Sequence, residues 1–182
     1  MFRKIRNFIL GFGLFLQMAD SLGTAQTVAP SEYQLKAAFI YNFAKFIDWP
    51  PEAFLNDNDP FIIGILGDDP FGNHLEGMVI GKTINTHPIM IQTFRNATDA
   101  INCHVLFISN SVQEKLPEII KKLEGSTVLT VGENERFIRA GGMINFLEVA
   151  KKIRFQINDD AAKAAKLKMS SKLLSLALPT NR

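Results

Sequence analysis

Three short, largely apolar runs constrain the fold of this chain more than any other feature of its sequence. They are FIIGIL (61–66), HVLFIS (104–109) and STVLTVG (126–132). A strand reads as a continuous apolar run when both faces of its sheet are covered, whereas a strand with one wet face alternates. Helical patterns separate the runs, and strands separated by helices imply parallel crossovers.

Two further segments complete the predicted sheet. HPIMIQTF (87–94) predicts another strand, and GMINFLEVAKKIRFQIN (142–158) predicts two strands joined by a turn at Val149–Lys152. The sequence therefore predicts an α/β fold: a three-layer sandwich with a mixed, largely parallel sheet of about six strands and helices on both faces.

The stretch YQLKAAFIYNFAKFIDWP (33–50) is unusually aromatic. Three interpretations are open for this stretch: a membrane-seeking helix, a partner-binding face or a core helix. Ser31 with Gln34 predicts a capped start, and the Pro50-Pro51 pair predicts an end near Ile47. The segment is shorter than the roughly 20 apolar residues that a membrane span needs. We expect a core helix.

The first 25 residues have the build of a secretory signal peptide. A basic start is followed by an apolar run over 8–18 and by small residues, with cleavage expected after Ala25. Residues 26–182 then form a single domain, located in the periplasm and without membrane insertion. Removing 1–25 leaves equal numbers of acidic and basic side chains, which argues against a nucleic-acid partner.

Motifs for catalysis are lacking in this sequence. The turn GILGDDPFG (64–72) follows a strand but matches no phosphate-binding loop, and we interpret it as structural. A small-ligand crevice at Asp68, Asp69 and Gly72 is the alternative, because α/β sheets bind ligands at the carboxyl ends of their strands. Glu133 and Glu135 are interpreted as solvated loop charges.

The histidines and the cysteine carry no recognisable chemistry either. The three histidines lack metal-ligand spacing, so we expect no metal and no cofactor. The single cysteine, Cys103, cannot form an internal disulfide, and its apolar surroundings favour a small buried side chain over a redox thiol. We expect a binding or regulatory protein and not an enzyme.

An ordered series of segments resembles the YfiR-like family of exported bacterial proteins, over about residues 31–177. The series is YQLKAAFIYNFAKFIDWP, IGILGDDPFG, CHVLFIS, VLTVGE, GGMINFL, IRFQIN and LKMSSKLLSLA. The resemblance implies a periplasmic α/β domain that represses a membrane-bound diguanylate cyclase by binding its sensor region. It also implies sequestration by an outer-membrane lipoprotein and an effect on cyclic-di-GMP and biofilm.

The resemblance places the partner surface in the C-terminal third of the chain. The matching positions are Ile144 and Phe146 in GGMINFL and Arg154 and Gln156 in IRFQIN. Strand alternation puts Arg154 and Gln156 on one face and apolar residues on the other. An ordinary hairpin that covers the sheet is the alternative. The family pattern often includes paired cysteines, and Cys103 has no partner here, so disulfide control is not expected.

Two functions follow as hypotheses. The first is a periplasmic regulator that binds an inner-membrane sensor, and the second is a periplasmic small-molecule binding module. The hairpin also offers an edge for self-association, so a homodimer is a further expectation.

Overall fold

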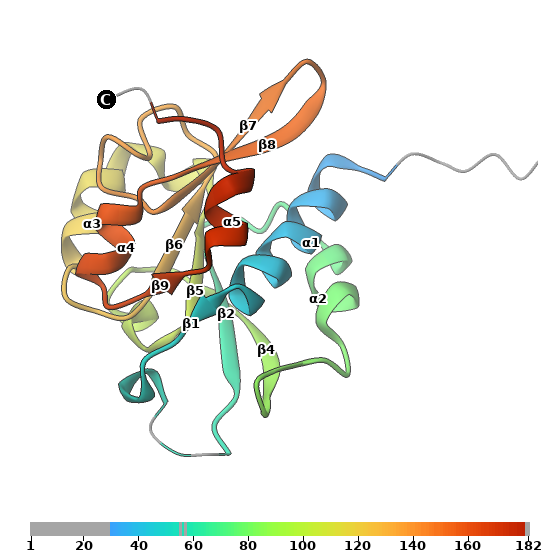
Figure 1. The fold of residues 1–182 in the computed structure, drawn as a ribbon, viewed down its shortest axis with the longest axis vertical. Coiled ribbons are helices and arrows are strands. Elements are labelled where there is room, and N and C mark those ends of the chain that lie inside the picture. Colours follow the sequence, from blue (N-terminus) through green and yellow to red (C-terminus); the bar gives the residue numbers. More distant parts are fainter. Residues whose placement is uncertain (1–29, 55, 57, 181–182) are drawn as a thin grey trace, which may run out of the picture.

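The computed structural model describes residues 30–54, 56 and 58–180 (Figure 1). The predicted signal peptide and its cleavage site after Ala25 lie outside these residues. Of the described helices, none is long and apolar enough to cross a membrane.

A seven-stranded sheet forms the centre of the fold. Its strands are β2 (Phe61–Leu66), β3 (Thr83–Ile84), β4 (His87–Phe94), β5 (Val105–Ile108), β6 (Leu129–Gly132), β7 (Ile144–Val149) and β8 (Lys152–Ile157). Their order is β3-β4-β2-β5-β6-β7-β8. The neighbours from β4 to β7 are parallel, and β3 and β8 add antiparallel edges. The predicted mixed, largely parallel sheet is confirmed, with the two-residue β3 beyond the six strands expected.

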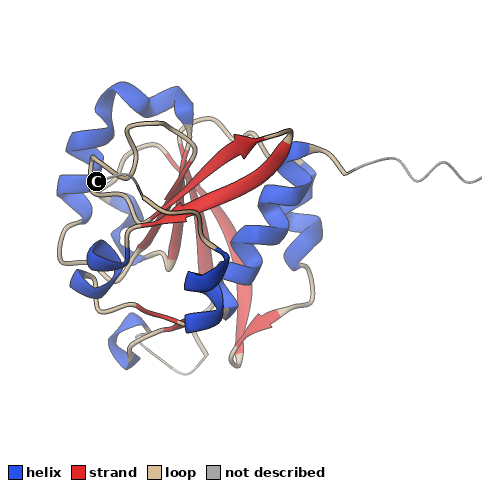
Figure 2. Ribbon diagram, turned by 45° about the horizontal axis from the view of Figure 1, so that its top comes forward, coloured by secondary structure: helices blue, strands red, loops and turns tan. Residues whose placement is uncertain are grey.

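Helices cover both faces of this sheet, as predicted (Figures 1 and 2). One face packs against α1 (Glu32–Lys45), α2 (Asn73–Val79), α4 (Asp159–Ala164) and α5 (Ser171–Leu176), and the other against α3 (Leu116–Leu123). Short 3₁₀ turns are η1 (Pro51–Ala53), η2 (Asp99–Asn102) and η3 (Asn110–Lys115). The α/β sandwich is confirmed.

The run FIIGIL serves two cores at once. Ile63 and Ile65 are fully buried on the α1 side, whereas Leu66 belongs to the core on the α3 side. Gly64 also faces the α3 side, where a β-carbon would lie 2.7 Å from the Phe94 ring. The Phe94 and Leu106 side chains of the two neighbouring strands fill the space beside Gly64, so a larger residue there would have to displace them.

The aromatic stretch forms a core helix, as expected. The Gln34 N–H donates to Ser31 Oγ at 3.2 Å, which confirms the predicted cap. Phe43 is 1% exposed, and its ring centroid lies 5.0 Å from that of Phe155 and 5.6 Å from that of Phe146. Helix α1 thus binds the base of the β7–β8 hairpin through aromatic contacts.

The end of this helix differs from the expectation. It stops at Lys45, because Ile47–Asp48 forms the short strand β1, which pairs with β9 (Lys168–Met169). Trp49 is half-buried, and its indole N–H donates to the Ala44 carbonyl at 3.0 Å. The Pro-Pro pair therefore follows a strand, and pairing with β9 ends the helix before it.

A cluster of rings closes the amino-terminal end of β2 and β5. His104 is 4% exposed, and its ring lies 4.5 Å from that of Phe61 and 4.6 Å from that of Phe54. Its Nδ1 accepts a hydrogen bond from the Ile62 N–H at 3.0 Å. Because an accepting Nδ1 carries no proton, the imidazole ring is neutral in this arrangement. Burial lowers the pKa of His104 to about 4.

We expect the Phe43→Ala variant to lose about 3–5 kcal/mol of the free energy of unfolding, because a fully buried ring leaves a cavity. Urea unfolding followed by the fluorescence of Trp49, the single tryptophan, measures this loss. Ile80→Ala is the control: Ile80 is 81% exposed, and its removal should change the free energy by about 0.5 kcal/mol or less. Equal effects of the two substitutions would contradict the core assignment of α1.

We also expect the free energy of unfolding to fall as the pH drops from about 6.5 towards 4. In this window the unfolded state binds a proton at His104 and the native state does not, because the native pKa is lowered. The full loss is about 3 kcal/mol. His104→Asn keeps an acceptor for the Ile62 N–H and should flatten the profile. His74→Asn, at an exposed histidine, is the control and should leave the fall in the free energy of unfolding as it is. If the fall persists in His104→Asn, protonation of His104 is not its cause.

Candidate functional site

A buried ion-pair network joins α1 to the carboxyl end of the parallel strands. The Lys36 ammonium contacts the carboxylates of Glu32 and Glu133. The side chain of Lys36 is 5% exposed and that of Glu133 is 8% exposed. Glu133 directly follows β6, so this contact fixes the start of α1 over the end of a central strand.

Two further groups satisfy the Glu133 carboxylate. The Tyr33 hydroxyl donates to Oε1 at 3.1 Å, and the Asn110 side-chain amide donates to the same oxygen at 3.4 Å. Burial of Lys36 lowers the pKa of its ammonium, but hydrogen bonds to Glu133 and Glu32 outweigh this effect and raise the pKa above the usual value. The lysine therefore stays charged, and its charge is compensated inside the protein.

A hollow of about 190 Å³ opens beside this network. Segments far apart in the sequence line it, and they come from α1, η3, the loop after β6 and both strands of the hairpin: Glu32, Tyr33, Lys36, Asn110, Glu133, Phe146, Leu147, Glu148 and Ile153. Because its buried polar groups bind one another, the network is built to hold elements together. It offers few unsatisfied groups to a ligand.

The prediction that Glu133 is a solvated loop charge is wrong. Lys36 is the clue that sequence reasoning missed, since it shares a helical face with Ala37, Ile40 and Phe43, all of which are buried. A lysine on the apolar face of a helix needs a buried acid, because an unpaired buried charge is costly. The sequence alone does not identify which acid that is.

The β7–β8 hairpin projects beyond the rest of the sheet (Figure 1). Val149 pairs with Lys152, so Ala150 and Lys151 make the two-residue turn that was predicted. Their φ angles are +50° and +60°, as a tight hairpin turn of this hand requires. Neither residue is glycine or asparagine, so the turn keeps a conformation that side chains disfavour.

The four hairpin residues suggested as partner contacts fall into two groups. Ile144 and Phe146 are 0% and 1% exposed and point into the core shared with α1. A partner cannot touch these two side chains in this conformation. Arg154 is exposed and Gln156 is half-buried on the opposite face, so any direct contact falls to them and their neighbours.

The residues suggested as a ligand crevice lie in the turn after β2. The Asp68 N–H donates to Ser111 Oγ at 2.8 Å, and Asp69 Oδ1 accepts the Phe71 N–H at 2.7 Å. Gly72 has a φ of +53° and directly precedes α2. The Asp69 contact shapes the turn and the Asp68 contact attaches it to η3, which supports the structural interpretation. The hollow beside Lys36 is lined by other residues.

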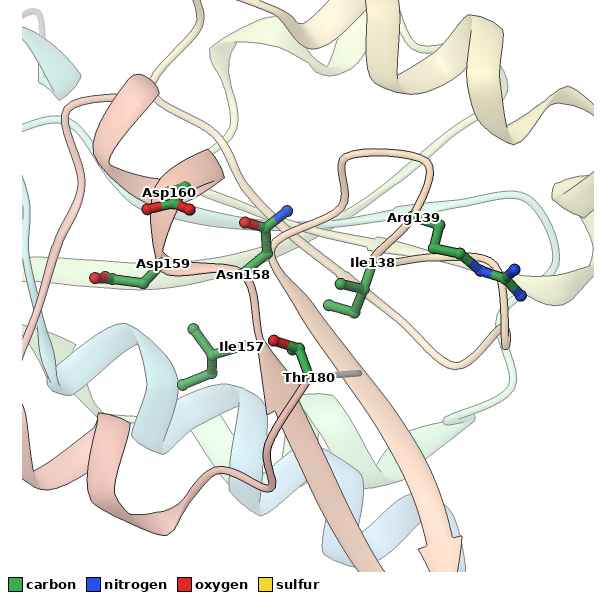
Figure 3. A pocket seen from close by; sticks show the side chains of 7 residues that line it. All are labelled: Ile138, Arg139, Ile157, Asn158, Asp159, Asp160 and Thr180. Atoms are coloured by element: carbon green, nitrogen blue, oxygen red, sulfur yellow. The ribbon is translucent and has the colours of Figure 1, made fainter. Parts of the chain in front are cut away.

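A second, open hollow of about 500 Å³ lies where β8 meets α4 (Figure 3). Asp159 and Asp160 lie on one side of it, and Arg139 lies across from them with its guanidinium turned away. Asp159 pairs with Lys163 at 2.6 Å. The side chains that line this hollow therefore do not converge on a common point.

Metal and thiol chemistry find no support in the part of the chain that the structure describes. Within residues 30–54, 56 and 58–180, no group of three His, Cys, Asp or Glu side chains is arranged to hold a metal ion. Cys103 is buried, and its burial raises the pKa of the thiol to about 12. The expectation of a small buried side chain at Cys103 is confirmed.

A family model described as YfiR/HmsC-like matches residues 33–178. The chain belongs to the YfiR/HmsC-like family. The match contains the Lys36–Glu133 network and the whole β7–β8 hairpin, and it ends at Leu178, whose N–H donates to the Phe155 carbonyl of β8 at 2.8 Å. A search of curated proteins finds no match.

We expect Lys36→Met to lower the free energy of unfolding by about 3–5 kcal/mol, because it leaves Glu133 buried without its cation. The double variant with Glu133→Gln should lose less than the sum of the two single changes. Urea unfolding of the four proteins gives the coupling, which we expect to exceed about 1 kcal/mol.

The exposed pair Lys163–Asp159 provides the control for this cycle. The side chain of Lys163 is 67% exposed, so Lys163→Met should leave the free energy of unfolding almost unchanged. Additive effects at Lys36 and Glu133 would show that the two residues do not act as a pair.

Proposed function

We propose that this protein is a periplasmic regulator that binds and represses the sensor region of an inner-membrane signalling protein. The signalling protein is a diguanylate cyclase, which makes cyclic-di-GMP and so favours biofilm. The observation that carries this proposal is the YfiR/HmsC-like match over residues 33–178. Export by the signal peptide at 1–25 puts the chain on the same side of the membrane as the sensor.

The mechanism is stoichiometric binding. A regulator that binds one conformation of a sensor more tightly than the other shifts the sensor towards that conformation. The repressor therefore has to recognise the inactive state of the sensor and release the active one. An outer-membrane lipoprotein that binds the same regulator relieves repression by competition.

The architecture supports binding through a rigid surface. The hairpin projects from the sheet, while its base is fixed by the rings of Phe43 and Phe155, and the Lys36–Glu133 pair holds the helix that carries Phe43 against the end of β6. A surface held in one conformation loses little entropy on association. Arg154, exposed on this hairpin, is the predicted contact residue that is most accessible to a partner.

The second candidate, a periplasmic small-molecule binding module, receives less support. The Asp68 N–H binds Ser111 of η3, the Asp69 carboxylate binds within its own turn, and the polar groups in the hollow beside Lys36 bind one another. A ligand site needs convergent polar groups that are free to bind.

The experiment is affinity purification of the tagged full-length chain from membranes of its own host, together with cyclic-di-GMP measurement. We expect a membrane signalling protein to co-purify, and deletion of the gene to raise cyclic-di-GMP. Arg154→Glu should reduce the amount of co-purified partner and raise cyclic-di-GMP towards the level of the deletion strain. Lys121→Glu, on the exposed side of α3, should change neither. Unchanged cyclic-di-GMP in the deletion strain and the absence of any membrane partner would overturn the proposal.

A further inference from the structure

The outer edge of the sheet at β8 is only partly covered. Gln156 pairs with Leu178 in a single parallel bridge, and the Leu178 N–H donates to the Phe155 carbonyl at 2.8 Å. The side-chain amide of Gln156 also donates to the Pro179 carbonyl at 2.9 Å. Within residues 30–54, 56 and 58–180, no other pairing lies on the outer edge of β8, so the stretch Lys152–Arg154 has no strand beside it.

The direction of the backbone groups along β8 follows from the hairpin register. In an antiparallel pair, alternate residues turn their N–H and C=O groups towards the partner strand or away from it. The Phe155 carbonyl points outward to Leu178. The backbone N–H and C=O of Ile153, two residues earlier, therefore also point outward. The N–H and C=O of Ile153 therefore extend the line of groups that the tail of the chain already uses.

The exposed side chains along the β8 edge are mainly basic. Lys151, Lys152 and Arg154 are exposed at the tip and along one face of β8, whereas Ile153 is half-buried on the other face. Basic side chains on an edge strand oppose pairing with a second copy, because like charges would lie opposite one another. The same side chains favour an added strand that carries acidic residues at alternate positions.

We propose that an extended, acidic segment of a partner protein adds to the outer edge of β8 at Lys152–Arg154. Its backbone pairs with the N–H and C=O of Ile153, as in other cases of strand addition. Its acidic side chains lie beside Lys152 and Arg154, and the apolar side chains between them lie beside Ile153. This inference rests on the proposed function, since it specifies the chemistry of the segment that the regulator recognises.

The test uses the purified full-length chain and two short blocked peptides, one alternating Val with Glu and one alternating Val with Lys. We expect the Val-Glu peptide to bind about tenfold more tightly than the Val-Lys peptide. Binding should slow amide exchange at Ile153, measured by NMR. The amides of Lys152 and Arg154 face β7 and should change much less.

Two variants separate backbone pairing from charge. Ile153→Pro removes one outward-facing N–H. Because proline is tolerated at such edge positions, this variant should fold but no longer bind the Val-Glu peptide. The fluorescence of Trp49 checks the fold. Lys152→Glu with Arg154→Glu should reverse the preference in favour of Val-Lys. Lys121→Glu with Lys122→Glu on α3, a matched change of charge, should keep the original preference.

Three results would overturn the inference. They are equal binding of the two peptides, binding that survives in both hairpin variants, and a dimer of the chain in which the Ile153 amide is protected without peptide. Co-purification of a membrane partner that persists in both hairpin variants would overturn strand addition and leave the proposed function standing.

Discussion

Aromatic packing between α1 and the base of the β7–β8 hairpin is the interaction on which the rest of this structure depends. Phe39 and Phe43 both contact Phe146 and Phe155, with centroid distances between 5.0 and 6.0 Å. The helix comes from the start of the described chain and the hairpin from its last third. Their contact closes the core over one face of the sheet, and the hairpin tip extends beyond it.

The Lys36–Glu133 pair adds a directional contact between the same helix, α1, and the loop after β6. Ring packing alone tolerates sliding and rotation, because burial of apolar surface is not directional. A buried ammonium between two carboxylates tolerates neither, since any displacement leaves a charge unpaired. The aromatic contacts thus supply most of the attraction between helix and hairpin, and the ion pair fixes the start of α1 over the end of β6.

Much of the fold was predictable, because it depends on local patterns. The apolar runs, the cap at Ser31 and the turn at Val149–Lys152 report directly on burial and backbone geometry. The short strands β1, β3 and β9 were not predicted, since a two-residue strand has no period to detect. The candidate site was less predictable. Alternation allowed two orientations for Ile144 and Phe146, and only the position of α1 shows that they face inward.

The tail residue Leu178 has a consequence for how long any complex at this edge would last. By pairing beside Gln156, it occupies the end of β8 nearest the body of the protein and limits an incoming strand to the few residues at the tip. A pairing so short forms few main-chain hydrogen bonds and dissociates quickly. Such brief occupancy would let the regulator of the proposed function pass from one partner to another without being degraded or resynthesised.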